Sequence, residues 1–250
     1  MEIRAKHVGR VRINPADFLE IDREQLVRAD FSGRQLEQVV AVEARFERCR
    51  FDGIQIRDAC FGEGRRTSHY VECSFDGGRI TGRPRGNARF ERCSFRDIDI
   101  REWFCFSVEM IDCVFTGKLH KVVFNGSVPD FVRQRIRRDR NEFHGNDFYG
   151  AKLIDVAFRA GIDLTLQRLP IGPEYLYLPD ARSAIASARR QLIEWTEPDR
   201  RSDALALLRG LESETEGGQE QLFLRPADFR GIGRRDVDDA VFDVLRAQAH

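Results

Sequence analysis

Residues 26–61 read LVRADFSGRQLEQVVAVEARFERCRFDGIQIRDACF. From Leu26 to Phe61, most of the residues at every fifth position are large and apolar. The position two residues earlier is mostly small or medium-sized and apolar, as at Ala29, Cys49 and Ala59, and polar residues lie between. Neither the 3.6-residue period of a helix nor the alternation of a strand gives this pattern. It indicates an internal repeat with a five-residue unit.

The same pattern continues well beyond Phe61 and covers about residues 26–163. Its later apolar positions are Tyr70, Phe75, Ile80, Phe90, Phe95, Ile100, Cys105, Met110, Phe115, Leu119, Phe124, Phe143, Phe148, Leu153 and Phe158. More than half of the chain therefore follows one repeat, which is typical of a solenoid.

Segments such as Ala29–Gly33 and Ala44–Arg48 resemble the pentapeptide-repeat family, whose unit is small, polar, Leu or Phe, polar, polar. The resemblance implies a mainly β fold: a right-handed four-sided β-helix with four units per coil and two inward apolar positions per unit. Residues about 20 apart would then stack in columns along the helix.

The sequence contains such columns once short insertions are allowed for. One predicted column is Phe31, Phe51, Phe75, Phe95, Phe115 and Phe148. Another is Leu36, Ile56, Ile80, Ile100, Leu119 and Leu153. We therefore expect about six coils, which at roughly 4.8 Å per coil give a rod about 29 Å tall.

Four cysteines fall into the same frame. Cys49, Cys73, Cys93 and Cys113 occupy the small inward position of one side. With no CxxC pair in the chain, a zinc site is not expected. We predict reduced thiols that pack as small hydrophobes, and we expect no metal.

Three segments interrupt the repeat: residues 62–69, 81–87 and 125–141. The column positions predict that all three leave the rod on the same side. All are rich in arginine, and the candidate binding residues are Arg65, Arg66, Arg83, Arg85, Arg133, Arg135, Arg137, Arg138 and Arg140. Clustered arginines create a local positive field even in a neutral chain.

These arginines have two interpretations. They form a docking ridge for nucleic acid, a phosphate ligand or an acidic partner, or they are ordinary residues of loops that tolerate insertion. The second interpretation is favoured, because arginine supplies nearly all basic residues of this chain. The third segment also fits an amphipathic helix with Phe131 and Ile136 facing inward.

The flanks differ from the repeat. Residues 1–25 are expected to form an N-terminal cap that covers the exposed edge of the rod. In residues 164–250 the apolar positions take helical spacing, for example Ala181, Ile185, Ala188, Leu192 and Trp195. This pattern predicts about three helices, which form a C-terminal cap or an interaction region, with homodimerisation as the alternative role.

Composition narrows the function classes. The 41 basic and 41 acidic residues balance, and no apolar run reaches the length of a membrane span. Without a signal-peptide pattern we expect a cytoplasmic protein that does not engage a membrane, and the arginine bias favours a bacterial source. Neither a phosphate-binding loop nor a GxSxG motif is present, so we predict no catalytic residues, no enzyme activity and no cofactor.

The favoured function is a scaffold that acts by protein–protein interaction. Nucleic-acid or acidic-partner binding through the arginine ridge is the first alternative. The family resemblance implies a second one, a DNA mimic that regulates DNA gyrase. Residues 41–163 carry 22 basic and 19 acidic residues, a net charge of +3, and this disfavours mimicry of a polyanion.

Overall fold

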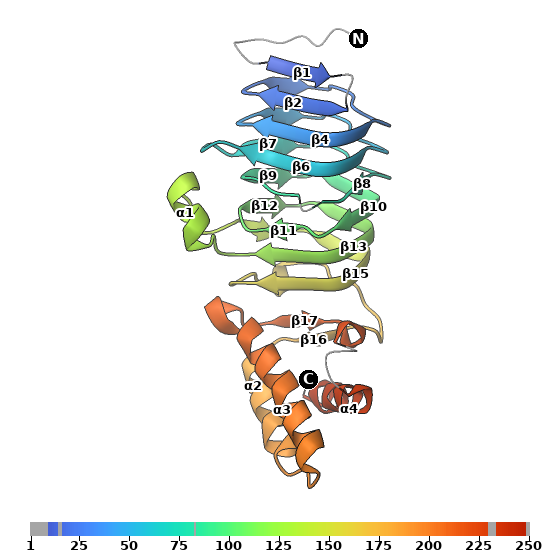
Figure 1. The fold of residues 1–250 in the computed structure, drawn as a ribbon, viewed down its shortest axis with the longest axis vertical. Helices are drawn as coiled ribbons and strands as arrows, with labels where there is room; N and C mark the ends of the chain where they lie inside the picture. The colour runs from blue at the N-terminus through green and yellow to red at the C-terminus, as the bar shows by residue number, and fades with distance from the viewer. Residues whose placement is uncertain (1–9, 15–16, 83, 230–233, 249–250) are drawn as a thin grey trace. The chain divides into compact units, whose positions relative to one another are not determined.

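The computed structural model describes residues 10–14, 17–82, 84–229 and 234–248. Two compact units divide the chain: one runs to Val156 and includes Leu164–Pro170, and the other holds Ala157–Asp163 and the residues from Ile171 onward. The first unit is a β-solenoid of stacked coils, and the second is mainly helical (Figure 1). The fold class predicted from the repeat is thereby confirmed.

Short parallel strands build the solenoid. In the described residues they form two ladders, with the strand orders β1-β2-β4-β6-β8-β10-β13-β11 and β14-β12-β9-β7-β5-β3, and β15 pairs with β13. Their bounds are β1 Arg10–Asn14, β2 Phe18–Asp22, β3 Gln25–Val27, β4 Gln35–Val42, β5 Arg45–Glu47, β6 Gln55–Glu63, β7 Ser68–Val71, β8 Arg79–Ile80, β9 Ala88–Glu91, β10 Ser94–Arg101, β11 Phe104–Cys105, β12 Val108–Ile111, β13 Val114–Asn125, β14 Phe143–His144 and β15 Asp147–Arg159.

The antiparallel pairing of β1 with β2 is the exception, and it covers the first edge of the ladder. Residues 1–9 and 15–16 of the predicted cap lie outside the described residues. Parallel stacking begins at Phe18, which pairs with Gln38 of the next coil.

The predicted phenylalanine column runs through the interior. Successive rings are stacked face to face, with centroids 5.0 Å apart for Phe31 and Phe51 and 4.8 Å apart for Phe95 and Phe115. The column continues to Phe148, 4.7 Å from Phe115. Six rings separated by five coil steps agree with a solenoid of about five turns, and offset stacking at this distance is favourable.

The other sides carry columns of their own. On the second side Leu36, Ile56, Ile80, Ile100 and Leu119 are in register. On the fourth side the column is Leu26, Phe46, Tyr70, Phe90, Met110 and Phe143. All of these side chains are buried, and they make up the core.

The third side is irregular. Between its inward residues Phe61 and Cys105, the described residues around Arg85 take the place of a regular unit, and the amide of Phe61 donates to Arg85 O. Trp103 is fully buried near this gap, with its ring 5.4 Å from Phe61 and 5.8 Å from Phe90. We infer that the indole fills the volume that a regular unit would have filled.

The four predicted cysteines form a buried column of free thiols. Each thiol donates to a carbonyl of the preceding coil, as Cys93 does to Tyr70 O at 3.2 Å and Cys113 to Phe90 O at 3.5 Å. Burial raises the pKa of Cys93 well above its usual value. The four side chains are buried as the repeat predicted, and their reduced state stays a prediction.

The second unit contains the predicted helices. Among the described residues they are α2 Ala181–Leu192, α3 Pro198–Glu214 and α4 Arg235–Arg246. They share an apolar core with the antiparallel strands β16 Leu176–Leu178 and β17 Leu222–Leu224. Trp195 packs against this core but lies beyond the end of α2, because the helix ends at Leu192. Single 3-10 turns are η1 Leu164–Leu166 in the first unit and η2 Glu216–Gly218 and η3 Pro226–Asp228 in the second.

Candidate functional site

The three interruptions of the repeat meet on the third side of the solenoid. The backbone amide of Asn87 donates to Gly62 O at 2.8 Å, and its side-chain amide donates to Arg65 O at 3.3 Å. The third segment reaches the first through Arg135, which contacts Glu63 at 2.6 Å. The predicted convergence is confirmed, and we call the combined surface of residues 62–69, 81–87 and 125–141 the insertion corner.

The third segment contains a short helix, α1 (Asp130–Ile136), which projects from the solenoid in Figure 1. A helix was expected here, but its predicted orientation is wrong. No residue of α1 is buried, and Phe131 is 76% exposed. The core is already filled by the stacked columns, so it offers no site for Phe131.

Four of the candidate arginines are neutralised by carboxylates of the same unit. Arg85 pairs with Asp58 at 2.5 Å, and Arg135 pairs with Glu63. The other two pairings are Arg133 with Asp130 and Asp139, and Arg138 with Glu109. The positive field expected from the sequence is therefore reduced by carboxylates of the rod and of the insertion segments themselves.

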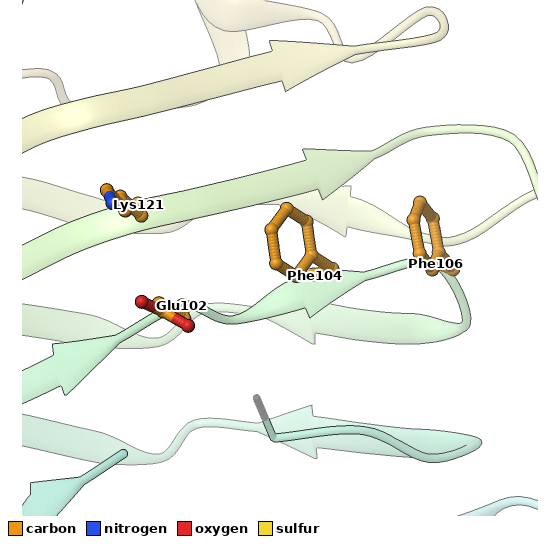
Figure 2. A pocket seen from close by; sticks show the side chains of 4 residues that line it. All are labelled: Glu102, Phe104, Phe106 and Lys121. Atoms are coloured by element: carbon orange, nitrogen blue, oxygen red, sulfur yellow. The ribbon is translucent and has the colours of Figure 1, made fainter. Parts of the chain in front are cut away.

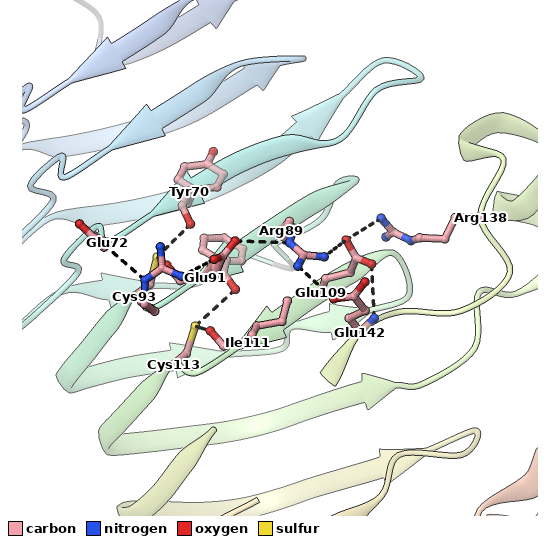
Figure 3. Close-up of polar contacts among 12 residues, drawn as sticks. Tyr70, Glu72, Arg89, Glu91, Cys93, Glu109, Ile111, Cys113, Arg138 and Glu142 are labelled. Atoms are coloured by element: carbon pink, nitrogen blue, oxygen red, sulfur yellow. Dashed lines mark hydrogen bonds and ion pairs between the residues drawn. The ribbon is translucent and has the colours of Figure 1, made fainter. Parts of the chain in front are cut away.

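Arg138 anchors the third segment in a partly buried polar cluster (Figure 3). Its guanidinium lies 3.1 Å from Glu109, whose side chain is only 8% exposed. Arg89 contacts the same carboxylate at 3.5 Å and pairs with Glu142 at 3.0 Å. Burial lowers the pKa of Arg138, whereas the hydrogen bond from Arg89 lowers the pKa of Glu142. Glu109 is nearly buried, so loss of a cationic partner would leave a carboxylate that is costly to keep out of water, and these contacts tie the insertion to the rod.

The remaining candidate arginines are more open. Arg65 and Arg66 are exposed, and their backbone amides donate to Glu43 Oε1 at 3.1 and 3.3 Å. Arg137 ends α1 in a left-handed conformation, and its amide donates to Arg133 O. Within the described part of the chain, the guanidinium groups of Arg65, Arg66 and Arg137 make no ion pair.

Two candidate arginines add little to this surface. Arg140 forms a backbone bridge with Ser127 inside the third segment. Arg83 lies outside the described residues.

An exposed aromatic cluster includes one residue of the third segment, Phe131. Phe104 and Phe106 flank the inward Cys105 and are 39% and 37% exposed. Their rings are stacked at 6.2 Å, and Phe131 of α1 meets Phe106 edge-on at 5.6 Å. Three rings from two distant segments thus form one continuous apolar surface, which we call the aromatic cluster.

A shallow hollow of about 500 Å³ opens beside the aromatic cluster. Figure 2 shows its lining residues, Glu102, Phe104, Phe106 and Lys121. Phe104 sits opposite Val123 of β13, so the rod fixes the floor of the hollow. The site therefore offers apolar rings with one acidic and one basic side chain at the margin.

Phe104 and Phe106 were not among the binding residues predicted from the sequence. The signal was present, because the repeat places polar residues on both sides of a central apolar residue, and here both positions hold phenylalanine. These two outward phenylalanines depart from the polar pattern of the repeat, and they do not pack in the core. Exposed apolar clusters of this kind are typical of binding surfaces.

Among the described residues, no group of three or more His, Cys, Asp or Glu side chains is placed to hold a metal ion. Cys60 directly precedes Phe61, the last residue before the first interruption, and burial raises the pKa of its thiol to about 11. No helix in the described ranges is long and apolar enough to cross a membrane.

Comparison with known proteins adds one finding. Neither a family model nor a curated protein matches this chain. Among solved structures, a trypsin-treated variant of QnrB1, a plasmid-mediated fluoroquinolone resistance protein, matches over 60% of this chain and 70% of its own. The identity is 16% and the TM-score is 0.17, so the fold assignment rests on the strand registers described above.

Proposed function

We propose that this chain is a non-enzymatic binding protein that docks a protein partner at the insertion corner. The observation that carries the proposal is the aromatic cluster of Phe104, Phe106 and Phe131 beside an arginine-rich surface. Aromatic residues and arginine are the residue types most enriched at protein interfaces and among their energetic hot spots.

Rigidity supports the same function. Phe104 and Phe106 are held by a strand in register with β13, and α1 is fixed to the rod by the Arg138–Glu109 pair. A surface that is ordered before binding loses less conformational entropy on association. The solenoid then serves as a scaffold that presents side chains from distant segments together.

Nucleic-acid binding is the runner-up. Binding to phosphates requires several unpaired cations, but at least four candidate arginines already pair with carboxylates. Mimicry of DNA is disfavoured further, since residues 41–163 have a net charge of +3. Neither alternative accounts for the exposed rings as directly as a protein partner does.

Site-specific photo-crosslinking tests the proposal. A photoreactive phenylalanine analogue replaces Phe106 in one variant and Val27 in a control, because Val27 is an exposed apolar residue on the fourth side of the same unit. In host lysate we expect a discrete protein adduct from position 106 and none from position 27. Nuclease-sensitive adducts at position 106, or equal labelling from both positions, would contradict the proposal.

A further inference from the structure

The aromatic cluster is small, and its Phe131 belongs to an arginine-rich segment of the insertion corner. Its three rings are linked by centroid distances of 6.2 and 5.6 Å, so it can cover one or two side chains of a partner and not a broad face. Eight arginines of the insertion corner lie in the described residues, and they face Glu63, Asp130 and Asp139 of the same segments and Glu43, Asp58 and Glu109 of the rod, a net charge of 8 − 6 = +2. Charge complementarity therefore favours an acidic ligand.

Three of the arginines at this corner are open to such a ligand. Among the described residues, the guanidinium groups of Arg65 and Arg137 form no ion pair, and Arg66 is attracted to Glu43 without a close pair. The pair of Arg135 with Glu63 is half exposed on both sides, and exposed pairs contribute little to stability. A partner carboxylate can therefore replace Glu63 at small cost.

Resting on the proposed function, we propose that the aromatic cluster binds a short acidic segment of the partner protein. One aromatic or large aliphatic side chain of that segment packs against Phe104, Phe106 and Phe131. Its flanking Asp or Glu residues pair with the open arginines of the insertion corner. Arginine suits this role because its planar group bonds a carboxylate in two places.

Peptide selection on the full chain tests this inference. Phage-displayed random 12-residue peptides are selected on the wild type, and the affinities of enriched peptides are measured for a Phe106→Ser/Phe131→Ser variant and a Val27→Ser control. All three target positions are exposed, so the variants keep the core, which thermal unfolding verifies. An Arg65→Ser/Arg66→Ser variant probes the charge requirement.

We expect peptides with one large apolar residue flanked by Asp or Glu. Their dissociation constants should rise at least about tenfold in the double-Phe variant and stay unchanged in the Val27→Ser control. The double-Arg variant should weaken binding and reduce its salt dependence.

Two results overturn the inference in different ways. Neutral or basic peptides that still require the rings would refute the acidic ligand and leave the protein-binding function intact. Failure to enrich any ring-dependent peptide would refute the aromatic cluster as a peptide site, and the crosslinking experiment then decides the proposed function separately.

Discussion

Replacing Phe95 with alanine removes a ring from the middle of the phenylalanine column. Phe95 is fully buried and stacks on Phe75 at 4.9 Å and on Phe115 at 4.8 Å, with Phe90 edge-on at 5.6 Å. Truncation of a buried phenylalanine costs about 3–5 kcal/mol. Three aromatic partners place Phe95 at the upper end of that range, because each pair contributes about 0.5–1.5 kcal/mol beyond area burial.

Urea unfolding followed by tryptophan fluorescence measures this cost. The chain has two tryptophans, and Trp103 belongs to the first unit while Trp195 belongs to the second. A Trp195→Phe background therefore reports unfolding of the solenoid alone. Phe106→Ala is the matched control, since its ring is partly exposed. A loss below about 1 kcal/mol for Phe95→Ala, or a loss equal to that of the control, would refute the packed column.

The remaining predictions concern a thiol, a close backbone approach and a carboxylate. Cys93 should resist maleimide in the native state at pH 8 and react after denaturation, because burial raises the pKa of its thiol; rapid native labelling in mass spectra would show that it is not inward. Gly62→Ala should lower the melting temperature and reduce the free energy of unfolding by at least about 2 kcal/mol, because a Cβ there would lie 1.9 Å from the carbonyl oxygen of Asn87. As the control, Gly210→Ala in helix α3, where an added Cβ would lie in open space, should stabilise the chain by about 0.5–1 kcal/mol. Two backbone amides lower the pKa of Glu43 below its ordinary 4.5. This carboxylate therefore contributes stability above about pH 4.5, and the contribution is lost as the pH falls through its lower folded pKa. Plots of unfolding free energy against pH for the wild type and Glu43→Gln should converge in acid, and a constant difference at every pH would contradict the assignment.

The sequence predicted the columns because a repeat fixes which positions face inward. Once Phe31 and Phe51 are placed one coil apart, the same spacing assigns every later member. The insertion corner was predictable for the same reason. After each insertion the five-residue repeat continues on the next side of the coil, so the residues that interrupt it must leave the solenoid just before that side.

Other features depend on contacts that a five-residue pattern does not encode. The burial of Trp103 depends on the absence of a regular five-residue unit on the third side of a neighbouring coil. The ion pair of Arg138 with Glu109 joins two residues that are 29 positions apart in the sequence. The exposure of Phe131 was also missed, because helical spacing indicates a possible apolar face but not whether the core has room for it. Local pattern therefore identified the scaffold, and tertiary packing determined the surface.

The uniformity of the phenylalanine column has a consequence for how the chain finds its native alignment. A coil that stacks one turn out of place still sets phenylalanine on phenylalanine, so this column alone does not distinguish correct neighbours from shifted ones. Trp103 does make that distinction, because its indole fits beside a coil in which the third side lacks a regular unit. The irregular residues thus disfavour coils that stack in the wrong register in an otherwise repetitive molecule.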